Sequence, residues 1–145
     1  IMTKDVVLIM DATQYYPGEE PQNSLTRVPA EYYLRNGSHY VMFEEIQDGF
    51  TEKVKGMLKI KKSSVELSKR GLVQSHMVFE NDLRYTTEYK TPFGSFMMEV
   101  CTGQLKIAEG EDEISLEIKY SLESEGRSVA DCLMKITITK KQPVG

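Results

Sequence analysis

Alternation of apolar and polar residues with a period of two most constrains the fold of this chain. In residues 114–122 every second side chain is apolar, and the residues between them, such as Glu117 and Lys119, are polar. Residues 132–139 repeat the pattern. Successive side chains of a β-strand point to opposite sides of a sheet, so the alternation predicts strands with one buried and one exposed face. A helix would instead need apolar residues at spacings of three and four.

Short turn signals separate the extended segments. Asn36-Gly37 is the strongest, because Asn-Gly favours the two-residue turn that joins the strands of a hairpin. Asp48-Gly49, Pro92-Phe93-Gly94 and Glu125-Gly126 divide other extended segments. Signals that recur about every 8 to 14 residues are typical of a β-meander that forms a sandwich or a barrel.

Two segments need a separate interpretation. Ser63-Ser64-Val65-Glu66 resembles a helix capping box. However, Ser68 and Lys69 occupy positions where an amphipathic helix would bury apolar residues, so we expect a short strand that ends at Arg70. Pro17–Ser24 contains two prolines and is predicted to be a polar loop.

The number of strands predicts the architecture. About 8–10 antiparallel strands with short connections leave sheet edges that need protection, and closure into a barrel removes those edges. We therefore predict an all-β fold, an antiparallel meander β-barrel, with a two-sheet sandwich as the alternative. The 145 residues fit one domain, 1–145, with a core that needs no disulfide or metal.

Charge and cysteine usage exclude several classes of protein. The net charge of −4 disfavours nucleic acid as a partner, and no apolar segment reaches the roughly 18 residues of a membrane-spanning helix. Cys101 and Cys132 lack the spacing of metal ligands, so we expect free thiols and no metal or other cofactor. The chain begins without the pattern of a secretory signal, which favours a cytoplasmic location.

The residues that would support catalysis are few. His39 and His76 are not accompanied by a nucleophile motif, so we favour a non-enzymatic protein. Glu44 shares a strand face with the apolar residues Met42 and Ile46, and it would need a partner if that face were buried. An enzyme that uses Glu44, His76 or Arg70 in a cavity is our third hypothesis.

Methionines and tyrosines on the predicted strand faces lead to the first hypothesis. Methionine fills irregular space, and a barrel of about eight strands holds its own side chains or one small ligand. We predict a non-enzymatic binder of a small, largely apolar ligand, with Arg70 as the anchor of a ligand carboxylate. The predicted lining residues are Met42, Met77, Tyr85, Tyr89, Met98, Tyr120 and Met134.

A filled barrel that binds a protein or RNA through its surface is the second hypothesis. Its binding surface would be an open sheet edge or the strand that carries Lys53, Lys55, Lys59 and Lys61. The more ordinary role of such a lysine row is a solvated strand face that discourages edge pairing.

The order of these segments also resembles a known family. AEYYLRNGSHYVMFEE (30–45), RGLVQSHMVFENDLRYTTEYKTPFG (70–94) and the strands that follow are similar to the YwiB-like family of small, uncharacterised Gram-positive bacterial proteins. The most specific part is Tyr89-x-Thr91-Pro92-x-Gly94, followed by Thr102 and Tyr120. The resemblance implies a closed or nearly closed calycin-type (lipocalin-like) barrel and carries no ligand with it. Pro29-Ala30 replaces an expected Thr-Gly-like pair, which predicts an altered bend or bulge at the barrel rim.

Overall fold

The computed structural model describes residues 2–46 and 52–141, and every regular element in them is a β-strand. This confirms the prediction of an all-β protein. The predicted turn at Asp48-Gly49 lies outside the described residues. The ten strands are β1 (Asp5–Tyr15), β2 (Gln22–Arg35), β3 (Ser38–Ile46), β4 (Lys53–Ile60), β5 (Ser64–Arg70), β6 (Ser75–Glu80), β7 (Arg84–Thr91), β8 (Gly94–Glu109), β9 (Glu113–Ser124) and β10 (Arg127–Lys140).

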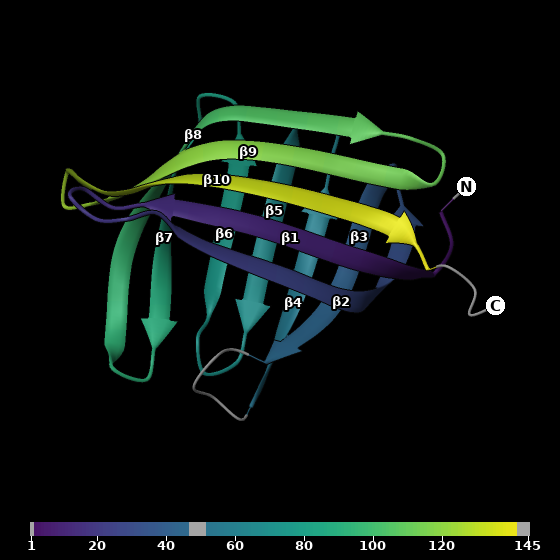
Figure 1. The fold of residues 1–145 in the computed structure, drawn as a ribbon, viewed down its shortest axis with the longest axis horizontal. Helices are drawn as coiled ribbons and strands as arrows, with labels where there is room; N and C mark the ends of the chain where they lie inside the picture. The colour runs from purple at the N-terminus through teal and green to yellow at the C-terminus, as the bar shows by residue number, and fades with distance from the viewer. Residues whose placement is uncertain (1, 47–51, 142–145) are drawn as a thin grey trace.

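All strands belong to one antiparallel sheet with the order β6-β5-β4-β3-β2-β1-β10-β9-β8-β7. Sequence neighbours pair as in a meander, and the pairing of β1 with β10 brings the two ends of the chain together. Figure 1 shows β8, β9, β10, β1 and β2 side by side across the front, with β3 to β6 crossing steeply behind them. β2 and β8 each bend from one layer into the other, which makes the sheet curl around a common interior.

The barrel is nearly closed where β6 meets β7. Gln74 and Lys90 form an isolated bridge, in which each backbone N–H donates to the other residue's carbonyl over 2.9 Å. The Thr87 hydroxyl adds a hydrogen bond to the His76 carbonyl at 2.6 Å. These contacts replace a continuous ladder, so the predicted barrel, and not the sandwich alternative, is the observed fold.

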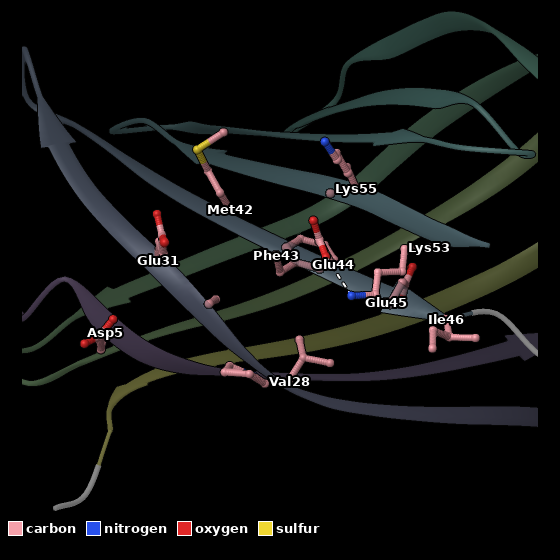
Figure 2. A pocket seen from close by; sticks show the side chains of 13 residues that line it. Asp5, Val28, Glu31, Met42, Phe43, Glu44, Glu45, Ile46, Lys53 and Lys55 are labelled. Atoms are coloured by element: carbon pink, nitrogen blue, oxygen red, sulfur yellow. Dashed lines mark ion pairs between the residues drawn. The ribbon is translucent and has the colours of Figure 1, made fainter. Parts of the chain in front are cut away.

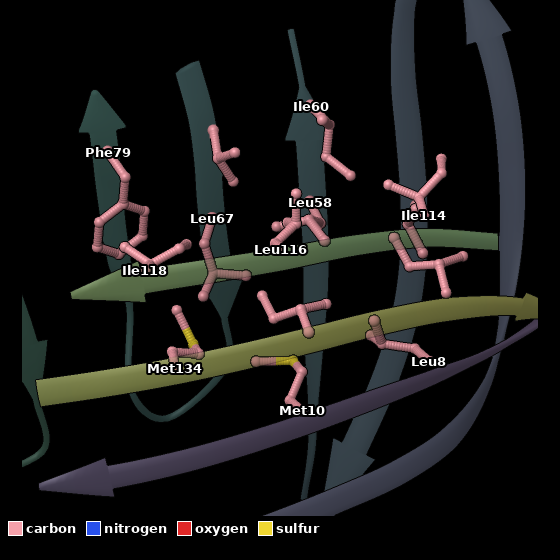
Figure 3. Close-up of a cluster of buried hydrophobic side chains, with 14 of the residues drawn as sticks. Leu8, Met10, Leu58, Ile60, Leu67, Phe79, Ile114, Leu116, Ile118 and Met134 are labelled. Atoms are coloured by element: carbon pink, nitrogen blue, oxygen red, sulfur yellow. The ribbon is translucent and has the colours of Figure 1, made fainter. Parts of the chain in front are cut away.

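The inward side chains of both layers form one apolar core. The predicted alternation of 114–122 and 132–139 is confirmed, because Ile118 and Ile136 are buried whereas Lys119 and Lys135 are exposed. Figure 3 shows side chains of the two layers interdigitating. Buried aromatic rings join this packing, with the centroids of Phe79 and Tyr120 only 4.9 Å apart. The centre of the barrel is therefore occupied by the protein's own side chains.

The hairpin turn and the short strand form where the sequence predicts them, but one predicted loop is shorter. Asn36 and Gly37 adopt φ of 50° and 78°, the left-handed pair that a two-residue hairpin turn requires. The predicted strand that ends at Arg70 is present as β5. The predicted loop Pro17–Ser24 is shorter than expected, because Gln22 already pairs with Gln14 as the start of β2.

Candidate functional site

A groove of about 800 Å³ lies where β2 parts from β3, and Figure 2 shows its lining. We call it the β2–β3 groove. Its walls carry both outward-facing residues, such as Glu44, and inward-facing residues, such as Phe43, because the groove follows a gap in the sheet. The lining residues are Asp5, Val28, Pro29, Ala30, Glu31, Met42, Phe43, Glu44, Glu45, Ile46, Lys53, Lys55 and Gly56.

The groove exists because β2 is paired on both sides along only part of its length. β2 pairs with β1 from Gln22 to Glu31, but it pairs with β3 only from Ala30 to Arg35. The next residue pair in that register would join Pro29 to Glu44. Proline has no N–H to donate, so it is found at strand edges and where pairing stops. Pro29 thus marks the point where the strands separate. Of the predicted altered bend or bulge, no bulge is present, because the register between β1 and β2 runs past Pro29 without a shift.

Within residues 2–46 and 52–141, no strand pairs with the open side of β2 before Ala30, and we call this side the free edge of β2. The Tyr32 N–H donates to the Lys4 carbonyl at 2.7 Å, so the backbone groups of even-numbered residues face β1. Bonding direction alternates along an antiparallel strand. The N–H and C=O groups of Asn23, Leu25 and Arg27 therefore point to the open side, where β3 would otherwise lie.

Carboxylates dominate the charge of the β2–β3 groove. Asp5 and Glu31 stand directly opposite each other on neighbouring strands. Glu44 lies 3.5 Å from Lys53 Nζ, and both side chains are largely exposed. Glu45 points inward and lies 2.8 Å from Lys69 Nζ, with its side chain only 11% exposed.

Residues 9–136 match the family model described as "Domain of unknown function (DUF1934)". The chain belongs to the DUF1934 family. Its structure is similar to the crystal structure of the YwiB protein from Bacillus subtilis, with a TM-score of 0.84, 19% identity, and coverage of 96% of this chain and 93% of that chain. At this identity the likeness shows the fold, and it confirms the YwiB-like barrel that the sequence resemblance implied.

No curated protein sequence matches the chain. Within residues 2–46 and 52–141 of the DUF1934 chain, no helix has the length and hydropathy needed to cross a lipid bilayer.

Two predicted site residues of this DUF1934 barrel face outward, so their predicted roles in the interior are wrong. Met42 lies on the outer face of β3 and is 48% exposed, because Val41 and Phe43 are the residues of that strand that face the core. Arg70 is exposed at the end of β5. The inward-facing cation is its neighbour Lys69, which was not among the predicted site residues.

The other predicted lining residues lie inside the barrel or near the junction of β6 and β7. Tyr120 and Met134 are buried members of the core, and burial raises the pKa of the Tyr120 hydroxyl. The half-buried remainder consists of Met77, Tyr85, Tyr89 and Met98. None of these residues lines the β2–β3 groove. A role for them in ligand binding stays a prediction.

Both histidines sit between a hydroxyl and a carboxylate. His39 Nδ1 is 2.6 Å from the Tyr32 hydroxyl, and its Nε2 is 2.8 Å from Glu109, which links the two layers of the barrel. On the outer face of β5 and β6, His76 Nδ1 is 2.7 Å from the Ser68 hydroxyl and its Nε2 is 3.4 Å from Glu66. The groove reaches neither histidine. We therefore assign these residues to the structure of the barrel.

One further cluster has the residue types of a metal site. Glu99, Cys101 and Glu123 place their ligand atoms within 4.8 Å of one another. However, the Arg84 guanidinium donates to both carboxylates, and the Cys101 thiol donates to Glu123 over 2.9 Å. The arginine supplies the positive charge between the carboxylates, so the cluster is an ion-pair network in this structure.

Proposed function

We propose that this DUF1934 chain is a non-enzymatic binding protein that adds an extended polypeptide segment to the free edge of β2. The observation that carries this proposal is the one-sided pairing of β2 over residues 23–29 beside the β2–β3 groove. A row of unpaired N–H and C=O groups is a template for another strand, and peptide recognition by strand addition uses such edges. Backbone hydrogen bonds would supply affinity, and the groove would hold alternate side chains.

The distribution of apolar residues supports this proposal. The interior of the barrel is packed with the core side chains, which favours a partner on the surface. At the groove, Val28 and Phe43 offer an apolar floor, and Ile46 is 64% exposed at its rim. A guest strand would cover this apolar surface and pair with the free edge at the same time. Free thiols at Cys101 and Cys132 support a cytoplasmic site of action, which is part of the proposal.

A phage-displayed library of linear peptides, panned on the full chain, tests the proposal. For the selected peptide we expect amide exchange at Leu25 and Arg27 to be fast in the free protein and slow in the complex, because these N–H groups face the open side. Leu25→Pro removes one of these donors and should weaken binding about tenfold, whereas Leu25→Ser keeps the donor and should bind nearly as well as wild type. The proposal is wrong if no peptide is selected, or if Leu25→Pro binds like wild type.

A small apolar ligand inside the barrel is the second candidate function. One observation favours it: the Thr102 hydroxyl is buried opposite Tyr120 and has no hydrogen-bond partner among the described residues. Buried polar atoms normally have partners, and a ligand would supply one. Native mass spectrometry after incubation with mixed fatty acids tests this candidate. A stoichiometric added mass that leaves on denaturation would support it, and a bare polypeptide mass would contradict it.

A further inference from the structure

We infer that the segment that adds to β2 is basic, with a lysine or arginine side chain on its outer face next to Glu31 and Glu44. This inference rests on the strand addition proposed above and names the chemical class of the partner. It is carried by the charges on the walls of the β2–β3 groove.

The first observation is an unfavourable pair of carboxylates. Asp5 of β1 and Glu31 of β2 are cross-strand partners, and both are exposed on the outer face of the sheet. Like charges that stand directly opposite in a sheet destabilise it. Among the ion pairs recorded for residues 2–46 and 52–141, none includes Asp5 or Glu31. The Tyr33 hydroxyl donates to Glu31 over 2.6 Å, which orients the carboxylate without neutralising it.

The opposite wall adds a further carboxylate. Glu44 stands on the outer face of β3, and its contact with Lys53 joins two exposed side chains at 3.5 Å. Exposed pairs of this kind contribute little stability, so a guest cation could compete for Glu44. Figure 2 shows Glu31 and Glu44 on the two strands that border the groove.

The alternation of a guest strand then determines which side chains meet these walls. Successive guest side chains would point to opposite faces of the sheet. Those that point inward would meet Val28 and Phe43, which are apolar. Where the guest strand reaches Pro29, an outward side chain would approach Glu31 and Glu44, and a cation there gains two favourable interactions whereas a carboxylate meets repulsion. Further along the free edge, the outward-facing side chain of β2 is Arg27, so the guest cation is expected at the end of the guest near Pro29 and not beside Arg27.

Three short capped peptides of equal length test this inference on the full chain. Valine alternates with lysine in the first, with threonine in the second and with glutamate in the third. We expect the lysine peptide to bind about tenfold more tightly than the threonine peptide and to lose most of that advantage at high salt. The glutamate peptide should bind most weakly.

A charge-matched pair of variants shows whether the groove causes the preference. Asp5→Asn/Glu31→Gln should reduce the ratio of lysine-peptide to threonine-peptide affinity to nearly one. Glu80→Gln/Glu88→Gln changes the net charge equally at exposed positions outside the groove and should leave the ratio unchanged. A loss of the ratio in both variants would overturn the inference, because it would show an effect of net charge alone.

The outcomes separate the two proposals. If lysine and threonine peptides bind equally and both slow amide exchange at Leu25, the basic class is wrong and strand addition stands. If binding of every peptide leaves exchange at Leu25 unchanged, or no peptide binds, strand addition itself is wrong.

Discussion

The ring of Phe43 lies on Gly56, its cross-strand partner, so closely that a Cβ atom at position 56 would be 2.2 Å from the ring Cζ. Because Gly56 has no side chain, it leaves space over β4. The Phe43 ring fills that space and is almost fully buried. An aromatic ring that covers a glycine on the neighbouring strand restores the packing that the glycine lacks. This contact forms the floor of the β2–β3 groove and fixes which face of β3 points inward.

Gly56→Ala should therefore destabilise the protein. We expect a loss of about 1–3 kcal/mol in the free energy of unfolding, because the new methyl group must displace a buried ring. Chemical denaturation measures this loss. Gly103→Ala is the matched control, since a Cβ atom there would be 3.7 Å from the nearest neighbour and should change stability little. Equal stability of Gly56→Ala and wild type would contradict the contact.

Proline substitutions on β2 should differ in effect between adjacent positions. The N–H of Thr26 points to β1. Thr26→Pro therefore removes a hydrogen bond between β1 and β2 and should lower the free energy of unfolding by about 1–3 kcal/mol. The N–H of Leu25 faces the open side, so Leu25→Pro should cost clearly less. Thermal or urea unfolding of the two variants checks the order. The reverse order would show that β2 exposes the other set of backbone groups.

Neutralising Asp5 and Glu31, which face each other across two strands, should stabilise the fold and weaken the binding of a basic peptide. Asp5→Asn/Glu31→Gln removes a like-charge pair, and we expect a gain of about 0.2–1 kcal/mol in unfolding free energy at low salt. Salt should raise the stability of the wild type more than that of the variant, because ions screen the repulsion. Denaturation at two ionic strengths tests both effects. A less stable variant would mean that the carboxylates have a structural role.

The cross-layer chain through His39 should contribute to the closure of the barrel. His39 is 15% exposed on its side chain, and His39→Ala would leave the buried Tyr32 hydroxyl without this partner. We expect a loss of about 1–3 kcal/mol in unfolding free energy. A double-mutant cycle with Tyr32→Phe isolates the pair, because the His39→Ala loss should be smaller once the hydroxyl is absent. An unchanged loss would contradict the coupling.

The Cys101 thiol should react slowly with iodoacetamide at neutral pH. Burial raises its pKa, and the hydrogen bond to Glu123 raises it further, whereas Arg84 lowers it. Because the thiolate is the reactive form, Glu123→Gln should speed alkylation and Arg84→Gln should slow it. Mass spectrometry of alkylation in a Cys132→Ala background follows the reaction at Cys101. Identical rates in the two variants would contradict the network.

Glu123 should contribute to stability in a pH-dependent manner. The hydrogen bond from Cys101 and the charge of Arg84 lower the pKa of Glu123 below its ordinary value. Its contribution is therefore complete above the unfolded pKa and is lost as the pH falls through the lower folded pKa. Carbon NMR titration of the Glu123 carboxyl should show the pKa returning toward the ordinary value in Arg84→Gln. No change in that titration would exclude the arginine as a cause.

Several features of the fold follow from the sequence alone. In residues 114–122 and 132–139 the alternation gives each strand one apolar and one polar face. It therefore predicts both that a strand forms and which face is buried. Asn36-Gly37 determines its hairpin, because both residues tolerate the left-handed backbone that the turn requires. These features can be predicted without knowing which strands are neighbours in the sheet.

Only the tertiary structure determines which side chains face inward where the local sequence pattern is ambiguous. β3 has apolar residues on both faces, so the alternation could not choose between Met42 and Phe43, and only the space above Gly56 on the next strand selects Phe43. Arg70 was predicted to be the inward-facing cation, but Lys69 takes that position on β5, beside Glu45. The sequence contains Pro29, but the effect of this proline on strand pairing depends on which residue of the neighbouring strand lies opposite it. Pairing between distant segments determines the groove, and that information lies in the register of the sheet.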